Sequence, residues 1–183
     1  MKKQGTSLSG VYVVASENHD DSRGRFARLF CAKALAPIIG DRSIVQINHS
    51  QTTKSGTVRG LHYQKKPYSE MKLIRCLKGA VWDVAVDLRK GSATFLKWYA
   101  QELTPENNLM MVAPEGVAHG FQTLKPDTEL LYLHTEYYQP IHEAGVRYDD
   151  ALINISWPLN VEDVSDRDLS FSLIDEQFKG LEV

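Results

Sequence analysis

Short apolar segments separated by turn signals fill the middle of the chain, from residue 57 to residue 135. The clearest is Val81–Leu88, in which apolar residues alternate with Asp83 and Asp87. That period of two predicts a strand with one buried face and one exposed face. Many short strands at such spacing favour a sandwich or jelly-roll barrel over a parallel α/β sheet. The chain is therefore predicted to be all-β.

The remaining elements follow from the same patterns. Further strands are expected at Ser9–Val14, Ser43–Asn48, Lys72–Leu77, Phe95–Glu102, Leu109–Ala113, Gly120–Leu124 and Leu130–Thr135. Helical spacing predicts a helix over Phe26–Ala36, which Pro37 and Gly40 would end. A short terminal helix is expected over Ser170–Phe178. The barrel is thus predicted to carry short N- and C-terminal helical extensions.

A single domain is expected over residues 1–183, because the chain has no internal repeat and no long linker. Its jelly-roll core is predicted at residues 43–140. A net charge of −2 favours neither nucleic-acid nor membrane binding, so a polyanionic ligand would need a local basic cluster. The two cysteines lack metal-ligand spacing, and neither a signal peptide nor a membrane-spanning stretch is apparent. A reducing, cytoplasmic location is therefore predicted.

The stretch Val58–Gln64 brings an arginine, a glycine and a histidine within four positions. Arg59 suits a phosphate-type anion, and His62 is a proton acceptor near neutral pH. Gly60 permits a bulge or a close backbone approach. We interpret this segment as the floor of an active site with His62 as its base. The alternative is a buried structural histidine beside a surface arginine.

Three further segments carry candidate groups. Lys72 shares its strand parity with Ile74 and Cys76 and is predicted to point inward, although a lysine at a strand entry often faces water. His119 follows a Pro-Glu-Gly turn between small residues, which fits a cavity wall as well as a structural histidine. Tyr132 lies in a tyrosine-rich strand. It could deliver a proton in a dry pocket or simply form an aromatic strand edge.

A metal site is the main chemical alternative. His62, Glu70 and His119 supply two imidazoles and a carboxylate, but no His-x-His pair occurs. That set offers few ligands for a zinc or iron site. We therefore predict neither a metal nor a cofactor.

Several motifs, taken together and in this order, resemble the RmlC-type dTDP-4-dehydrorhamnose 3,5-epimerase family. They are Asp21–Gly24, Gln46–Ser50, Arg59–Gln64, Lys72–Arg75, Asp83–Ser92, Pro114–Phe121, Tyr137-Tyr138, Trp157-Pro158 and Ser165–Asp168. The resemblance extends over most of the chain, from Gly10 to Asp168. It implies a cupin-type jelly-roll barrel, a homodimer and no metal requirement.

The resemblance also implies a reaction on a nucleotide-linked 4-keto-6-deoxyhexose, of the type that converts dTDP-4-dehydro-6-deoxyglucose to dTDP-4-dehydrorhamnose. The ketone acidifies the hydrogens on C3 and C5, so a base can remove one and an acid can return a proton to the opposite face. His62 matches the family's base and Tyr132 its proton donor. Lys72 matches the cation beside the 4-oxygen. Asp168 matches the carboxylate that holds the tautomer of His62, as the aspartate of a triad does.

Substrate binding is carried over by resemblance as well. The matching positions are Arg23, Arg28, Gln46, Asn48, Arg59, His119, Tyr138, Glu143 and Arg167. Arg23, Arg59 and Arg167 correspond to positions around the diphosphate, where an arginine fork suits the geometry. Tyr138 corresponds to the tyrosine that stacks on the base. N-terminal residues such as Arg23 can reach the partner subunit's site in this family.

Three positions depart from the family's usual pattern. Arg28 stands where a glutamate is common, Leu133 where a lysine often follows the donor tyrosine, and Ser69–Met71 where a glutamine is more usual. These changes concern the nucleotide and the sugar more than the proton-transfer set. An epimerase acting at one carbon of another nucleotide-deoxysugar therefore stays open.

Three classes of function remain. A cofactor-independent epimerase of a nucleotide-4-ketosugar is favoured. A metal-dependent cupin, either isomerase or oxygenase, would use His62, Glu70 and His119. A non-catalytic sugar-nucleotide binding module would have no need of both a base and an acid, which argues against it.

Overall fold

The computed structural model describes residues 1–183. In chain order its elements are β1 (Lys2–Gly5), β2 (Tyr12–Ala15), β3 (Asn18–Asp21), β4 (Gly24–Ala27), α1 (Ala32–Ile39), β5 (Gln46–Thr52), β6 (Thr57–Gln64), β7 (Lys72–Lys78), β8 (Val81–Asp87), β9 (Trp98–Leu103), β10 (Leu109–Ala113), β11 (Val117–Thr123), β12 (Thr128–His134), β13 (Glu143–Gly145), β14 (Asp163–Val164) and α2 (Asp166–Leu169). Strands dominate, and the predicted all-β class with short helical extensions is confirmed.

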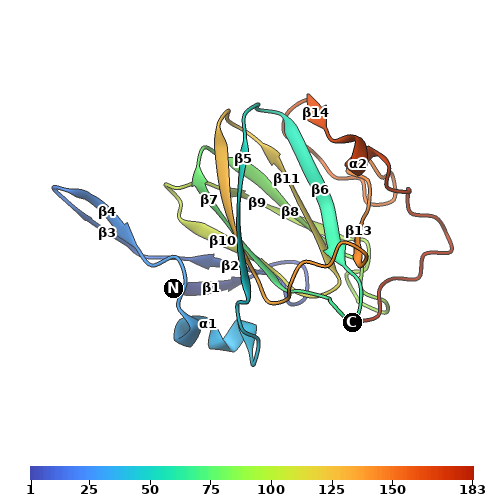
Figure 1. Ribbon diagram of the computed structural model, residues 1–183, viewed down its shortest axis with the longest axis horizontal. Coiled ribbons are helices and arrows are strands. Elements are labelled where there is room, and N and C mark those ends of the chain that lie inside the picture. Colours follow the sequence, from blue (N-terminus) through green and yellow to red (C-terminus); the bar gives the residue numbers. More distant parts are fainter.

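Two sheets form the jelly-roll barrel (Figure 1). The first has the strand order β1-β2-β10-β7-β12-β5, and the second β13-β6-β11-β8-β9. The short strand β14 pairs in parallel with β6. Most neighbours in these sheets are far apart in sequence, so the barrel brings distant segments side by side.

The apolar core forms three clusters. One lies between the sheets and includes Ile74 of β7 and Phe121 of β11. The second packs the outer face of the first sheet against Leu35 of α1. In the third, Leu61 and Val84 of the second sheet pack against the C-terminal segment, which follows β13 and comprises residues 146–183. Both sheets are therefore covered on both faces over much of their area.

This double cover corrects one prediction. Asp83 and Asp87 of β8 are both fully buried, although the alternating pattern predicted an exposed face for them. They share strand parity with Val81 and Ala85, which belong to the cluster between the sheets. The apolar face of β8 is covered from outside by the C-terminal segment. The alternation in β8 therefore separates two buried faces, one of which is apolar and the other of which carries the two aspartates.

The N-terminal region differs most from expectation. Residues 18–27 form a hairpin, β3–β4, that projects from the barrel in Figure 1. We call this hairpin the arm. The predicted helix over Phe26–Ala36 is wrong at both ends, since α1 begins at Ala32 and continues through Pro37 to Ile39. Burial of Leu35 and Ile39 against the first sheet stabilises the last turn. Gly40 ends α1 as predicted.

The base of the arm is fixed by a buried guanidinium. Arg75 of β7 is 1% exposed. It donates hydrogen bonds to the backbone oxygen of Leu29 (3.1 Å), to the hydroxyl of Ser16 (2.5 Å) and to Asn108 (2.9 Å). The two ends of the arm are therefore tied to one strand of the barrel.

The C-terminal segment runs along the outside of the barrel. The helix predicted over Ser170–Phe178 is wrong; the short helix α2 precedes it, and Ser165 caps α2 by accepting the N–H of Asp168 (3.1 Å). Phe178 packs on the second sheet, and Ile174 donates its backbone N–H to Asp150 (2.6 Å). These contacts hold the stretch against the barrel without a helix. No helix of the structure is long and apolar enough to cross a membrane.

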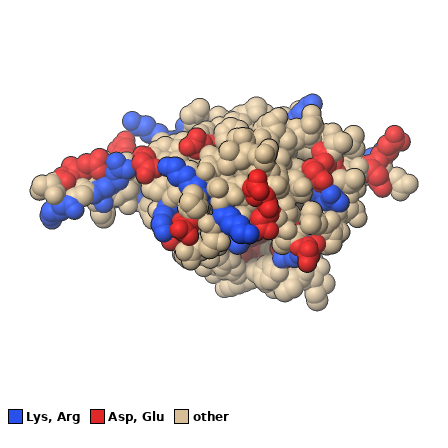
Figure 2. Space-filling view, turned by 90° about the horizontal axis from the view of Figure 1, so that it is seen from above, with Lys and Arg blue, Asp and Glu red and all other residues tan.

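Charges of both signs are interspersed on the face shown in Figure 2, along the arm as well as on the body. Such a surface offers no broad basic area for a nucleic acid on that face. Local clusters inside the barrel therefore matter more for an anionic ligand.

Candidate active site

A cavity of about 530 Å³ is lined by side chains from both sheets. The lining residues are Ile47, Asn48, His49, Ser50, Arg59, His62, Tyr63, Gln64, Glu70, Lys72, His119, Phe121, Tyr132, His134, Tyr138 and Glu143. Few of them are apolar, so the cavity suits a polar ligand that is held by many hydrogen bonds.

His62 of β6 is held by a buried aspartate. Its Nε2 lies 2.7 Å from Oδ1 of Asp168, whose Oδ2 accepts the backbone N–H of Gly60 at 2.9 Å. Burial raises the pKa of Asp168, but the hydrogen bonds from His62 and Gly60 outweigh it and hold this pKa below the ordinary value. Asp168 is therefore a carboxylate that fixes the His62 ring, and Nδ1 of His62 remains for proton transfer.

A glycine contact between two strands makes this arrangement possible. Strands β6 and β11 shift register next to His119. Gly60 has a φ of +121°, and a Cβ built there would lie 2.6 Å from Cα of Gly120. Only glycine fits such a close approach. The predicted close backbone approach at Gly60 is confirmed.

Lys72, at the start of β7, points into the cavity as its parity predicted. Its Nζ donates to the backbone oxygen of His62 (3.1 Å) and pairs with Glu70 (3.3 Å). The second oxygen of Glu70 lies 2.7 Å from Nδ1 of His134. An ammonium is therefore held beside the segment that carries His62.

Tyr132 of β12 lies between two histidines of the cavity wall. Its ring meets His119 edge-on at 6.0 Å and stacks with His134 at 6.1 Å between ring centroids. Ser50 donates a long hydrogen bond, 3.5 Å, to its hydroxyl. Burial raises the pKa of Tyr132 well above its ordinary value. Tyr132 thus keeps its proton near neutral pH and can donate it.

His119 of β11 is anchored from behind by Asp83 of β8, with 2.7 Å between Nε2 and Oδ1. Burial raises the pKa of Asp83 more than the contact with His119 lowers it. The second carboxylate oxygen of Asp83 has no hydrogen-bond partner. The contact fixes the imidazole ring of His119 in the cavity wall.

A separate cluster combines Tyr138, Glu143 and Arg167. The Tyr138 hydroxyl donates to Glu143 (2.5 Å), and Arg167 forms an ion pair with the same carboxylate. Arg59 also lines the cavity and donates to the backbone oxygen of Gln51 (3.3 Å). Two guanidinium groups are therefore available at or near the cavity for an anion.

The cavity lining contains eight of the residues predicted from the sequence. They are His62, Lys72, Tyr132, Asn48, Arg59, His119, Tyr138 and Glu143. Three more contact this set from behind: Asp168 through His62, Arg167 through Glu143, and Gln46 through Asn48 at 3.2 Å. Arg23 and Arg28 do not line the cavity. Arg23 lies on the arm, where it pairs with Asp21, and Arg28 follows the arm.

Sequence reasoning assigned no role to His134 or Asp83. His134 lies two residues after Tyr132, so strand parity alone places both side chains on one face. Asp83 is opposite Phe121 in the pairing of β8 with β11, two register positions from His119. Pairing of that kind depends on which strands are neighbours, and the sequence pattern does not state this.

Glu70 was considered only as a metal ligand. Its carboxylate is engaged by Lys72 and His134, while His119 is engaged by Asp83. No group of three histidine, cysteine, aspartate or glutamate side chains is arranged to hold a metal ion. These residues take part in ion pairs and hydrogen bonds with one another.

A histidine held by an aspartate, a tyrosine that keeps its proton and an ammonium share one cavity. This is the equipment for removing and returning a proton at an acidic carbon, with a cation for the charge that develops. Fold and site together define a jelly-roll enzyme of the acid–base type.

Comparison with known proteins then gives the family. The profile of the dTDP-4-dehydrorhamnose 3,5-epimerase family matches residues 5–176. The chain is 43% identical to the dTDP-4-dehydrorhamnose 3,5-epimerase of Sinorhizobium fredii over 155 residues, which is 85% of this chain and 80% of that protein. The chain belongs to the dTDP-4-dehydrorhamnose 3,5-epimerase family. The predicted family, enzyme class and type of function are confirmed.

Solved structures agree with this assignment. The crystal structure of the Bacillus anthracis dTDP-4-dehydrorhamnose 3,5-epimerase with TDP and PPi bound is 38% identical, has a TM-score of 0.91, and covers 94% of this chain and 99% of its own. An epimerase from Legionella pneumophila, in complex with dTDP-4-keto-L-rhamnose, is 34% identical with a TM-score of 0.91. It covers 100% of this chain and 98% of its own.

Proposed function

We propose that this protein inverts C3 and C5 of dTDP-4-dehydro-6-deoxyglucose and forms dTDP-4-dehydrorhamnose. One observation carries the proposal: the aspartate-held base His62 and the protonated Tyr132 line the same cavity as Lys72. The names of the relatives supply the substrate class. The cytoplasmic location expected from the sequence stays a prediction.

In the proposed reaction His62 takes a proton from the carbon next to the 4-ketone, and the C–H electron pair moves into an enolate. Lys72 stabilises the negative enolate oxygen. Loss of one such donor typically costs roughly 2.7–4 kcal/mol in the transition state. Tyr132 then gives its hydroxyl proton to the opposite face of the carbon, which re-forms the ketone with inverted configuration. Solvent exchange returns His62 and Tyr132 to their starting states, so no net proton is consumed.

Substrate binding is proposed for the polar residues around this set. Arg59 and Arg167 would hold the diphosphate, and the exposed ring of Tyr138 would stack on the base. Asn48 and Gln46 would contact the nucleotide, while His119 and Glu143 would contact the sugar end of the substrate. Neutralising the Glu143 carboxylate with Arg167 keeps this region compatible with an anion.

We further propose a homodimer in which the arm reaches the partner's cavity. Two observations support it: Phe26 on the arm is 71% exposed, and Arg23 pairs only with Asp21 on the same hairpin. Arg23, with Arg28 after the arm, would then complete the diphosphate end of a neighbouring site. Mixing an inactive Arg23→Ala protein with an inactive His62→Ala protein would restore partial activity in a shared-site dimer. Two proteins that stay inactive on mixing would contradict the shared site.

The function is tested by proton NMR of the purified protein with dTDP-4-dehydro-6-deoxyglucose in heavy water, without added metal. The proposal predicts deuterium at both C3 and C5 of the sugar. Deuterium at one carbon would identify a single-position epimerase instead. No exchange at either carbon would contradict the proposed substrate, with Arg28 pointing first to another nucleotide.

A further inference from the structure

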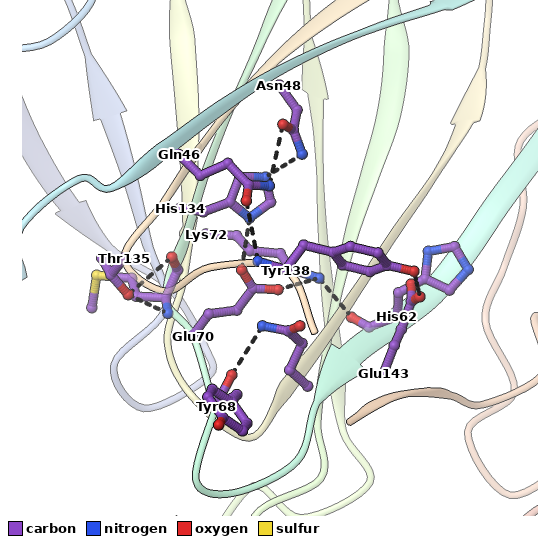
Figure 3. A network of polar contacts seen from close by, with 12 residues as sticks. Gln46, Asn48, His62, Tyr68, Glu70, Lys72, His134, Thr135, Tyr138 and Glu143 are labelled. Carbon is purple, nitrogen blue, oxygen red and sulfur yellow. Dashed lines mark hydrogen bonds and ion pairs between the residues drawn. The ribbon is translucent and has the colours of Figure 1, made fainter. Parts of the chain in front are cut away.

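A chain of polar contacts runs along one wall of the cavity and ends at Lys72 (Figure 3). Gln46 contacts Asn48 at 3.2 Å, Asn48 contacts Nε2 of His134 at 3.3 Å, and Nδ1 of His134 contacts Glu70 at 2.7 Å. Glu70 in turn pairs with Lys72 at 3.3 Å. Side chains of β5, β12 and β7 are therefore linked to one another through Glu70, which lies two residues before β7.

If Glu70 is a carboxylate, the hydrogen bonds of this series of contacts can have only one set of donors and acceptors. Glu70 can only accept, so Nδ1 of His134 must donate to it. With His134 neutral, Nε2 then accepts from the amide nitrogen of Asn48, and the amide oxygen of Asn48 accepts from Gln46. The far end is fixed to the main chain, because the backbone N–H of Tyr138 donates to Gln46 (3.1 Å). Every member is thus oriented by its neighbour.

The pair formed by Glu70 and His134 lies deep in the wall. The side chain of Glu70 is 7% exposed and that of His134 is 10% exposed. Burial raises the pKa of Glu70, but the hydrogen bond from His134 and the charge of Lys72 hold it below the ordinary value. Each carboxylate oxygen of Glu70 has one partner, Lys72 on one and His134 on the other.

The consequence falls on Lys72. An ammonium has three N–H donors on a flexible four-carbon stem. One donor is taken by the backbone oxygen of His62 and another by Glu70. The third is left for the cavity, where the proposed enolate oxygen would lie. Without Glu70 the side chain of Lys72 could rotate. Without His134 the carboxylate of Glu70 could rotate in the same way.

We propose that Glu70 and His134 are positioning residues that aim Lys72 at the enolate oxygen. This inference rests on the proposed function and adds two residues to it. In this role neither residue would touch the substrate's reacting atoms. They act through Lys72, in the way that a hydrogen-bonded partner orients a catalytic group.

Three substitutions test this inference, with one matched control. In Glu70→Gln the amide N–H₂ faces either Lys72 or His134, and each of these groups is itself a hydrogen-bond donor to Glu70 in the parent. His134→Leu removes the donor to Glu70, whereas His134→Asn keeps an N–H near the place of Nδ1. The control is Glu129→Gln, the same chemical change in a residue that pairs with His49 of β5 and Lys78 of β7 nearer the surface. For each protein one measures kcat, KM, dTDP affinity by calorimetry and the thermal midpoint.

Glu70→Gln and His134→Leu should lower kcat roughly 10- to 100-fold, as expected for lost orienting groups, while KM and dTDP affinity stay within about twofold. His134→Asn should stay within about threefold of the parent, and Glu129→Gln should match it. A parent-like kcat in Glu70→Gln or His134→Leu would overturn the inference. Equal losses of kcat in His134→Asn and His134→Leu would overturn it too. A loss of kcat that is matched by a loss of dTDP affinity and a lower thermal midpoint would have the same consequence. A parent protein without exchange would instead overturn the proposed function, and this inference with it.

Discussion

Asp168 holds His62 and the strand that carries it at the same time. One carboxylate oxygen lies 2.7 Å from Nε2 of His62, and the other accepts the N–H of Gly60 at 2.9 Å. Gly60 lies two residues before His62 on β6, and Asp168 lies in α2. The short helix therefore holds the His62 ring against its own strand, and the orientation of the ring depends on a residue from the C-terminal segment.

Replacing Asp168 by asparagine tests this contact. The amide can donate to His62 and would favour the wrong tautomer, so kcat should fall on the order of 10²–10⁴-fold. The matched control is Asp166→Asn in the same helix, an exposed residue without a contact to His62. Steady-state rates of both variants check the prediction. Equal rates for Asp168→Asn and Asp166→Asn would show that the contact is not needed.

Removing the hydroxyl of Tyr132 separates the two halves of the reaction. In Tyr132→Phe the base still removes the proton and can return a deuteron to the same face. The sugar should therefore gain deuterium at C3 or C5 with its configuration retained, while inversion drops roughly 10²–10⁴-fold. NMR of the product measures both quantities. Tyr137→Phe, which changes an exposed ring, is the control, and full inversion by Tyr132→Phe would exclude it as the donor.

Asp87 gives the fold a predictable dependence on acid. Burial raises its pKa, but hydrogen bonds from Arg89, Ser92 and Thr94 lower it further, to about 2 from an ordinary 3.8. Because the folded pKa is depressed, the stabilisation is complete above pH 4 and is lost as the pH falls towards 2. It amounts to about 2 kcal/mol of unfolding free energy.

Denaturant unfolding at pH 6 and pH 3 measures this contribution. The parent should lose more stability between these values than Asp87→Asn does, by about 1 kcal/mol or more. Asp149→Asn alters an exposed pair with Arg147 and should behave like the parent. Parallel losses in the parent and Asp87→Asn would contradict the assignment.

Arg75 holds the base of the arm, so its replacement should destabilise the arm. Arg75→Met leaves the backbone oxygen of Leu29 and the polar groups of Ser16 and Asn108 without their donor. The unfolding free energy should fall by about 2–4 kcal/mol. Limited proteolysis should cut residues 18–27 faster than in the parent. Arg42→Met, which breaks a partly exposed pair with Glu115, should cost less than about 1 kcal/mol, and an unchanged arm in Arg75→Met would contradict this role.

The barrel could be predicted because its strands follow simple rules. Residues 109–113 form the strand expected, and β7 differs by one residue from Lys72–Leu77. Period-two alternation and turn residues are local signals, and the strands that they predict are retained in the packed barrel. The parity of Lys72 was sufficient to place it in the cavity.

The arm and the termini could not be predicted, because tertiary contacts decide them. The hairpin at 18–27 is polar and gave no strand pattern, and the apolar residues after it mimicked a helix. Pro37 was expected to end α1, but burial of Ile39 outweighs the lost hydrogen bond. The contacts of Asp83 and Glu70 depend on which strands lie side by side. Arg23 and Arg28 lie away from the cavity, and in the proposed homodimer they would reach the cavity of a second copy of the chain.

Deuterium exchange by His62→Ala shows whether His62 is the base. Parent and variant are incubated with dTDP-4-dehydro-6-deoxyglucose in heavy water, and dTDP affinity is measured in parallel to show an intact site. If His62 is the base, exchange at both C3 and C5 falls to background in His62→Ala while dTDP still binds. Near-parent exchange at either carbon would contradict it, because another group would then be removing that proton.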